Sequence, residues 1–202
     1  MIGAFMPSRR KSAPAVAALM AAMAACPNLH AQQATEPRAK IPVFDIALSG
    51  VTFETGDTWS QGGERFRLYG VQSCIRGTTF TNAAGARGDC GEASLAYFAA
   101  LIRDTKPRCT TIARAGTPAL TYAVCAAHIG QASLDLGTIL ITQGFAFAAA
   151  DSHGGAVNLA YAVAEADAKA NRRGLWASID LPYPNAILSR AARQVDGPAR
   201  SQ

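Results

Sequence analysis

Four cysteines in the body of the chain carry the clearest chemistry, and their spacing bears on both disulfide formation and metal binding. They are Cys74, Cys90, Cys109 and Cys125. No Cys-x-x-Cys pair occurs among them, and His128 and His153 are not spaced as ligands, which argues against a zinc site. An even number of cysteines in an oxidising compartment instead predicts two disulfides. Four cysteines allow three pairings, so the count alone leaves the connectivity open.

The N-terminal segment has the three-part composition of a cleavable signal peptide. Residues 9–11 are basic, and the apolar stretch 13–25, about thirteen residues long, is too short to span roughly 30 Å of hydrocarbon. Pro27 breaks the helical pattern, and a Leu-His-Ala sequence ends at Ala31, where signal peptidase requires a small residue. We therefore predict cleavage after Ala31, so that residues 1–31 are removed and the product is periplasmic or secreted.

A second processing route remains open at Cys26. The sequence Met-Ala-Ala-Cys that ends there resembles a lipobox, in which the cysteine is acylated and becomes the new N-terminus. Pro27 directly after the cysteine favours the ordinary cut. The alternative product is a lipoprotein anchored through Cys26.

Removal of the signal peptide lowers the net charge of the chain. The full sequence has 19 Lys and Arg against 14 Asp and Glu, a formal charge of +5. Residues 9–11 supply three of the basic side chains and residues 1–31 contain no acidic one, so the mature chain carries about +2. This balance is weak support for a nucleic-acid partner. The absence of a further long apolar run predicts no transmembrane span after cleavage.

The hydrophobic pattern predicts one domain over residues 41–178, with a flexible leader over 32–40 and a surface tail over 179–202. Strands are expected over 42–53 with a break at Gly50, around Trp59, and over 65–71, 108–113, 120–127 and 145–149. Helices are expected over 91–103, 136–143 and 157–171, and residues 72–90 are expected to form a loop. This order predicts an α+β, mainly β, protein: a five-stranded antiparallel OB-fold barrel with about three helices.

Six short motifs follow one another at distances similar to those of the thermonuclease (staphylococcal-nuclease-like) family. They are Gly56-Asp57-Thr58, Arg67-Leu68-Tyr69-Gly70-Val71, Cys90-Gly91-Glu92-Ala93, Asp135-Leu136-Gly137, Gly144-Phe145-Ala146-Phe147-Ala148, and Tyr161 and Glu165 with Gly174-Leu175-Trp176. The resemblance covers residues 42–177 and implies an OB-fold. Several secreted members carry four cysteines in similar places, which implies the pairs Cys74–Cys90 and Cys109–Cys125. Each pair would close a loop of about sixteen residues, worth roughly 3 kcal/mol in the chain-entropy model.

Enzymes of this family cut phosphodiester bonds with a calcium ion, acidic ligands, a carboxylate acting on water and two arginines. A hard cation requires several oxygen ligands, and guanidinium groups match phosphate oxygens. The resemblance makes Asp57 an acidic metal ligand and Arg67 the first arginine. However, Thr55 stands where the family has a preceding aspartate, Gln72 replaces the second acidic ligand and Ile75 replaces the general base.

The remaining charged residues near these motifs do not restore the family pattern. The arginine of the family's hairpin turn has no equivalent, because Arg114 is displaced by several residues. Asp89 and Glu92 lie beside Cys90, and a disulfide to Cys74 would bring them toward the altered loop as substitute ligands or bases. The alternative reading of Asp57 is an ordinary turn residue. Arg67 would then pair with Asp57 or Glu64, and Glu165 would be structural.

These substitutions predict an exported, disulfide-bonded domain with a degenerate nuclease site that acts as a binding or accessory module. It would have no cofactor, and its partner would be a nucleic acid or an envelope protein. The alternative is a calcium-dependent phosphodiesterase with a modified site, in which Asp57, Arg67 and either Glu92 or Asp89 converge on one pocket. A third interpretation is a structural component of an envelope complex, which would show a large exposed apolar patch.

Overall fold

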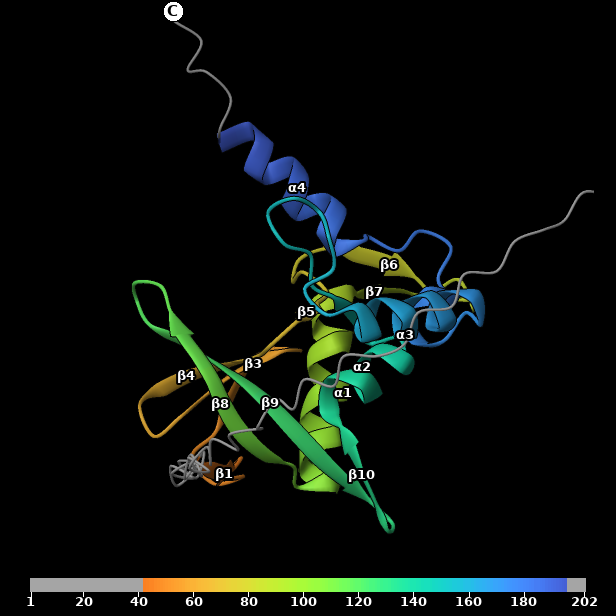
Figure 1. The fold of residues 1–202 in the computed structure, drawn as a ribbon. Helices are drawn as coiled ribbons and strands as arrows, with labels where there is room; N and C mark the ends of the chain where they lie inside the picture. Colours follow the sequence, from red (N-terminus) through yellow and green to blue (C-terminus); the bar gives the residue numbers. More distant parts are fainter. Residues whose placement is uncertain (1–41, 196–202) are drawn as a thin grey trace, which may run out of the picture. The chain divides into compact units, whose positions relative to one another are not determined.

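The computed structural model describes residues 42–195 (Figure 1). The predicted signal peptide, the leader and Cys26 lie outside these residues. The strands are β1 (Val43–Asp45), β2 (Thr52–Thr55), β3 (Thr58–Gln61), β4 (Glu64–Leu68), β5 (Val71–Ser73), β6 (Thr79–Thr81), β7 (Arg87–Asp89), β8 (Arg108–Ala115), β9 (Leu120–Ile129), β10 (Ala132–Asp135) and β11 (Ala146–Ala148). The helices are α1 (Cys90–Thr105), α2 (Leu136–Thr142), α3 (Leu159–Ala170), the 3-10 helix η1 (Gly174–Ala177) and α4 (Pro184–Val195).

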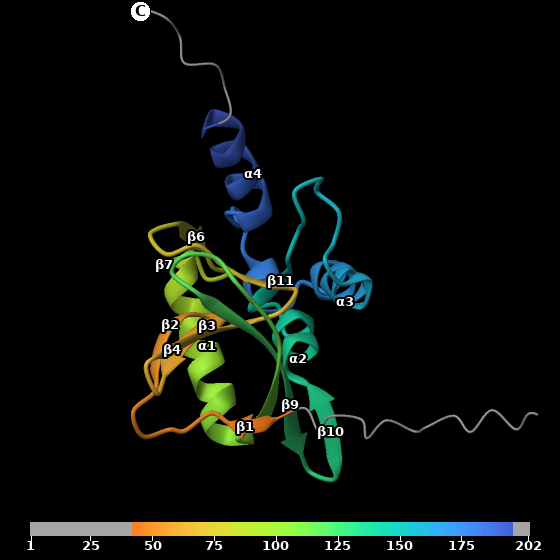
Figure 2. The same cartoon turned by 60° about the vertical axis from the view of Figure 1, so that its left-hand side comes forward.

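The fold is α+β and mainly β, as the sequence predicted. One seven-stranded sheet has the order β1-β8-β9-β4-β3-β2, with β10 paired to β9, and it curls around α1 (Figure 2). Two small sheets, β11-β5 and β6-β7, lie outside it. The main sheet therefore joins more strands than the five expected.

The expectation of a wholly antiparallel sheet is wrong at one pair of strands. β4 and β9 are parallel, with Phe66 opposite Thr121 and Leu68 opposite Ala123. A parallel pair requires a long crossover connection, and the segment from β5 through α1 and β8 supplies it. This crossover contains short strands as well as a helix, so it lacks the regular βαβ pattern by which a parallel pair is recognised in a sequence.

Three further differences concern short elements. The expected strand 42–53 is divided into β1, which pairs with β8, and β2, which pairs with β3. The expected loop 72–90 contains the β6–β7 hairpin, and the expected surface tail contains α4, so the described residues form four α-helices rather than about three. Pro184, which starts α4 and is fully buried, has a backbone already suited to a first helical position.

Two buried clusters hold these elements together. The larger one packs the sheet on α1 and α2 around Trp59, Phe66, Phe98 and Leu140. The smaller one joins Phe147 and Leu175 to the first disulfide, and Trp176, Leu181 and Tyr183 pack against it. The smaller cluster fixes the chain that leads into α4.

Both disulfides implied by the family resemblance are present. Cys74 and Cys90 have Cα atoms 5.5 Å apart and link the end of β5 to the start of α1. Cys109 and Cys125 lie directly opposite one another on β8 and β9, with Cα atoms 4.0 Å apart. The first disulfide holds the loop after β5 against α1, beside the residues that the sequence singled out.

Helix ends follow the capping residues of the sequence. Asp89 caps α1 by accepting the N–H of Glu92, and Asp135 caps α2 by accepting the N–H of Thr138 at 2.7 Å. Gly144 follows α2 with a φ of +77°, and a Cβ there would lie 2.1 Å from the carbonyl oxygen of Arg173. Only glycine permits this approach, which brings the end of α2 against the chain that follows α3.

Candidate functional site

The residues matched to the family's active site surround one hollow of about 370 Å³, which we call the arginine pocket. It is lined in part by Asp57, Arg65, Arg67, Gln72, Ile75 and Arg76. Asp57 comes from the turn between β2 and β3, Arg67 from β4 and Gln72 from β5. Leu188 of α4 completes one side of the pocket. The pocket thus combines residues 55–76, from neighbouring strands and the loop after β5, with Leu188 from near the other end of the described chain.

Gly56 allows the turn that carries Asp57 to approach α1. A Cβ at this position would lie 2.8 Å from the backbone carbon of Ser94 on that helix. The register of the next two strands places Thr58 opposite Arg67, so the turn and the arginine are neighbours. The Gly-Asp-Thr sequence is therefore a packing motif that aims Asp57 toward β4 and β5.

The Asp57 carboxylate is buried and fully engaged by the protein. Its Oδ1 accepts hydrogen bonds from the hydroxyls of Thr55, Thr58 and Ser73 at 2.5, 2.9 and 3.2 Å. Its Oδ2 accepts the N–H of Ser73 at 3.1 Å and the Nε–H of Arg67 at 3.1 Å. A carboxylate offers about four lone-pair positions, so five donors leave none for another ligand. Asp57 is only 2% exposed.

Arg67 is held by the same group and by Gln72. Its Nη2 lies 3.0 Å from Asp57 Oδ2 and donates to Gln72 Oε1 at 2.8 Å. Gln72 donates in turn to the carbonyl of Ser73 at 2.8 Å. The sequence-based alternative in which Arg67 pairs with Asp57 is therefore the one that the structure adopts. The Arg67 side chain remains 28% exposed and lines the pocket.

The oxygen atoms of the arginine pocket do not fit the needs of a calcium ion. Calcium binds six to eight oxygens, several of them anionic. The pocket offers one carboxylate, which is saturated by internal donors, while the Gln72 oxygen is occupied by Arg67 and Ile75 offers no oxygen from its side chain. Across residues 42–195, no group of three or more His, Cys, Asp or Glu side chains is arranged to hold a metal.

Glu92 and Asp89 serve other roles and do not line the arginine pocket. Glu92 forms an ion pair with Arg76, whose Nε donates to it at 2.9 Å. Asp89 accepts the N–H of Glu92 at 2.9 Å and the N–H of Gly77 at 2.6 Å. The hydrogen bond from Glu92, helped by that from Gly77, lowers the pKa of Asp89 from its ordinary value of 3.8. The modified-enzyme alternative requires Glu92 or Asp89 to meet Asp57 and Arg67 in one pocket, and neither of the two lines this pocket.

Arg65 and Arg76 are pocket residues that the sequence analysis did not select. Arg65 donates to Glu54 at 2.6 Å, and the side chains of Arg65 and Arg76 are 49% and 50% exposed. Residues i and i+2 of a strand share a face, so the spacing of Arg65 and Arg67 on β4 was a usable signal. Arg76 lies in the loop after β5, where no repeating sequence pattern predicts which way a side chain points.

The other residues that the sequence analysis weighed lie away from this pocket. Arg114 is on β8, 3.9 Å from Glu64, and does not line the pocket. His128 is exposed near the end of β9, and His153 lies in an exposed loop where its N–H donates to Asp151 at 2.8 Å. Their positions agree with ordinary surface roles.

The closing motif of the family resemblance has structural roles. The hydroxyl of Tyr161 donates to Asp135 at 2.8 Å, and burial, together with this carboxylate, raises the pKa of Tyr161 well above its ordinary value. Glu165 Oε2 accepts the N–H of Ala148, the last residue of β11, at 2.7 Å. These two bonds attach α3 to α2 and to β11.

Comparison with known proteins adds no family assignment. Neither the protein-family models nor the sequences of curated proteins give a match to this chain. Within residues 42–195, none of the helices combines the length and hydrophobicity needed to cross a bilayer.

Proposed function

We propose that this chain is an exported OB-fold protein of the thermonuclease-like type that has lost its metal site and acts as a binding or accessory module. The observation that carries the proposal is the saturation of Asp57 by Thr55, Thr58, Ser73 and Arg67. Without a free carboxylate, the pocket has neither a hard-metal site nor a general base in reach of a water. Loss of a base or of a charge-stabilising group costs about 10²- to 10⁴-fold in rate each.

Three arginines favour an anionic group as the ligand of the arginine pocket. Arg65 and Arg76 are each about half exposed in their ion pairs with Glu54 and Glu92, and such surface pairs contribute only about 0–1 kcal/mol. Their guanidinium groups are therefore available to exchange a glutamate for a phosphate or carboxylate of a partner. Arg67 would remain on Asp57 and present its exposed side.

Export is the second part of the proposal. It is supported by the composition of residues 1–31 and by two disulfides, which persist in oxidising compartments. Mass spectrometry of the product isolated from a bacterial periplasm would identify the N-terminus. The proposal expects it to begin after Ala31, whereas an acylated Cys26 would identify a lipoprotein.

A nuclease assay tests the loss of catalysis. The exported protein is incubated with single-stranded DNA and calcium, magnesium or manganese, beside a preparation from cells with an empty vector. We expect no cleavage above that background. Metal-dependent cleavage that Arg67→Ala abolishes would instead establish the modified phosphodiesterase.

A binding assay tests the anionic ligand, with a labelled single-stranded oligonucleotide as the probe. We expect salt-dependent binding that weakens in Arg65→Gln and Arg76→Gln, because each removes one guanidinium from the pocket. Arg114→Gln is the matched control, since Arg114 is an exposed arginine outside the pocket. Equal losses of affinity in all three variants would show that binding depends only on the general surface charge.

A further inference from the structure

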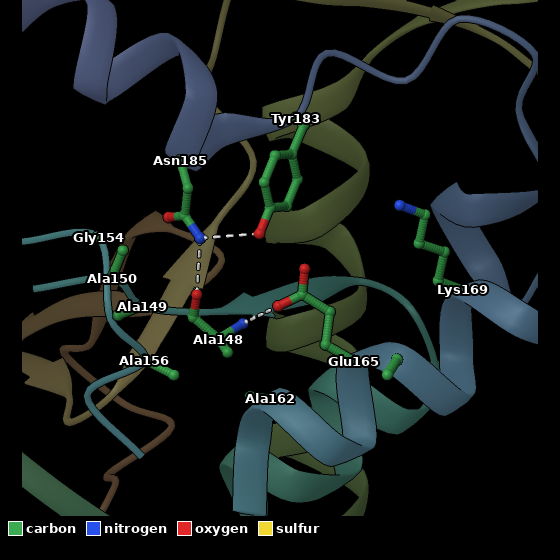
Figure 3. Close-up of a pocket in the computed structure, with 11 residues that line it drawn as sticks. Ala148, Ala149, Ala150, Gly154, Ala156, Ala162, Glu165, Lys169, Tyr183 and Asn185 are labelled. Carbon is green, nitrogen blue, oxygen red and sulfur yellow. Dashed lines mark hydrogen bonds between the residues drawn. The ribbon is translucent and has the colours of Figure 1, made fainter. Parts of the chain in front are cut away.

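A second hollow, separate from the arginine pocket, lies between α3, β11 and the start of α4 (Figure 3). We call it the alanine pocket, and its volume is about 300 Å³. Its walls include Ala148, Ala149, Ala150, Ala156, Ala162 and Ala166. Glu165, Lys169, Tyr183 and Asn185 supply its polar groups. Small side chains leave the space open, and its volume lies at the lower end of the range for ligand sites.

The two charged residues of this pocket do not neutralise each other. Glu165 and Lys169 are four residues apart on α3, in the order that favours an ion pair on a helix. No salt bridge joins them within the part of the chain that the structure describes. Instead, Glu165 is bound to Ala148, and the Lys169 ammonium lies 5.4 Å from the centre of the Trp176 ring. The pocket thus has an anionic group and a cationic group at different points of its wall.

The polar groups of the pocket are held in place by the backbone of Ala148. Its N–H donates to Glu165 Oε2, and its carbonyl accepts from Asn185 Nδ2 at 2.8 Å. The same Asn185 nitrogen donates to the Tyr183 hydroxyl at 3.1 Å. The phenolic hydrogen faces the neighbouring Glu165 carboxylate, and burial together with this carboxylate raises the pKa of Tyr183. Because Ala148 engages only one Glu165 oxygen, the other oxygen faces the pocket beside Tyr183 (Figure 3).

We propose that the alanine pocket binds a small zwitterion, namely a free α-amino acid with a small side chain. The ammonium group of the ligand pairs with the second Glu165 oxygen, which has a lone pair beyond the one that faces Tyr183, and its carboxylate pairs with Lys169. The alanine walls leave room for a short side chain. This proposal does not depend on the function proposed for the arginine pocket, and it involves binding without a chemical step.

The separation of charges is the basis of the specificity. A ligand with one charge would satisfy Glu165 or Lys169 but leave the other as it is in the free protein, whereas a zwitterion satisfies both. Hydrogen bonds to charged groups contribute about 1.5–3 kcal/mol, which corresponds to about 10- to 100-fold in affinity. The lower end of that range, about tenfold, applies to the half-buried Glu165, whereas the pair made by the exposed Lys169 contributes at most about fivefold.

The test is a titration of the ¹⁵N-labelled exported protein followed by NMR, with three ligands of nearly equal size. L-Alanine carries both charges, N-acetyl-L-alanine only the carboxylate, and L-alanine amide only the ammonium group. We expect saturable shifts at Ala148, Ala162 and Tyr183 with L-alanine. Binding should be about tenfold weaker with N-acetyl-L-alanine, which cannot pair with Glu165, and about two- to fivefold weaker with L-alanine amide, which cannot pair with Lys169. The absence of saturable shifts with L-alanine at tens of millimolar, or equal binding of all three compounds, would overturn the proposal.

Variants locate the binding in the pocket. Glu165→Gln keeps an oxygen for the N–H of Ala148 but removes the negative charge, and Lys169→Gln removes the positive charge. Glu165→Gln should weaken L-alanine binding about tenfold and Lys169→Gln about two- to fivefold, while both leave the remaining NMR spectrum unchanged. Lys106→Gln, which removes an exposed lysine at the end of α1, is the matched control and should bind as the original chain does. Unchanged binding in both pocket variants would overturn the proposal even if the original chain binds L-alanine.

Discussion

The arginine pocket and the alanine pocket use charged side chains in opposite ways. In the arginine pocket, Asp57 is buried and its carboxylate accepts five hydrogen bonds from the protein. In the alanine pocket, Glu165 accepts the N–H of Ala148 and interacts with the Tyr183 hydroxyl, and Lys169 has no ion-pair partner within residues 42–195. The first carboxylate serves the fold, whereas the second retains lone pairs for a ligand.

This difference shows that residue type does not by itself define a functional site. Asp57 has the sequence context of a metal ligand, yet its internal donors leave no lone pair for one. Glu165 has the context of a structural helix residue, and its bonds to Ala148 and Tyr183 use about two of the four lone-pair positions of the carboxylate. The number of atoms left without internal partners is the better measure of what a charged residue offers to a ligand.

The largest expected effect comes from removing the buried carboxylate. Asp57→Ala leaves the hydroxyls of Thr55 and Thr58 and the N–H of Ser73 without their acceptor and leaves Arg67 without its counter-charge. We expect a loss of about 3 kcal/mol in the free energy of unfolding, measured with urea. Glu165→Gln, which preserves the bond to Ala148, should cost less than about 1 kcal/mol. Equal losses of unfolding free energy in the two variants would contradict the view that only the Asp57 carboxylate serves the fold.

A second prediction concerns how the Asp57 turn is positioned. In Gly56→Ala the added Cβ would lie 2.8 Å from backbone atoms of Ser94, so the turn or α1 must move. We expect a destabilisation of about 1–3 kcal/mol by thermal or urea unfolding. Gly62→Ala is a useful comparison, because nothing lies within 4 Å of a Cβ there and only its backbone strain is at issue. A stable Gly56→Ala protein would show that the turn is not held by this approach.

A third, smaller effect is expected at Asp89, which caps α1 near the arginine pocket. Asp89→Ala should cost about 1 kcal/mol of stability at neutral pH, the usual value for an N-cap. The pKa of Asp89 is lowered in the folded protein, so its ionised form stabilises the fold above the ordinary value of 3.8. That contribution is lost as the pH falls through the lowered pKa. The difference between Asp89→Ala and the original chain should therefore shrink when unfolding is repeated below about pH 4.

The smallest effect on stability is expected from Lys169→Gln. An exposed cation over an aromatic ring contributes about 0.5–1 kcal/mol, and Lys169 has no salt bridge in the described part of the chain. Urea unfolding should therefore change by no more than about that amount. A much larger loss would mean that Lys169 stabilises the fold around Trp176, and would weaken its assignment to a ligand.

Much of the fold was accessible from local sequence patterns. The apolar repeat over 91–103 predicted α1, and the strands expected over 108–113 and 120–127 form the β8–β9 pair. The helix expected over 136–143 is α2, with Asp135 as its N-cap. The parallel pairing of β4 with β9 was not accessible, because it joins segments more than fifty residues apart whose own patterns are equally compatible with antiparallel neighbours. The helix α4 was missed because the prolines before it were read as the start of an irregular tail.

The sequence by itself determined the chemistry that is missing from the arginine pocket, since Gln72 and Ile75 lack carboxylates in any fold. Only the tertiary structure decided that Asp57 is consumed by internal hydrogen bonds and that Glu92 turns to Arg76 instead. It also decided that Glu165 and Lys169 face a hollow without pairing. The physical reason is that a side chain's unused hydrogen-bonding capacity depends on neighbours brought close by folding, and residue types along the chain do not record those distances.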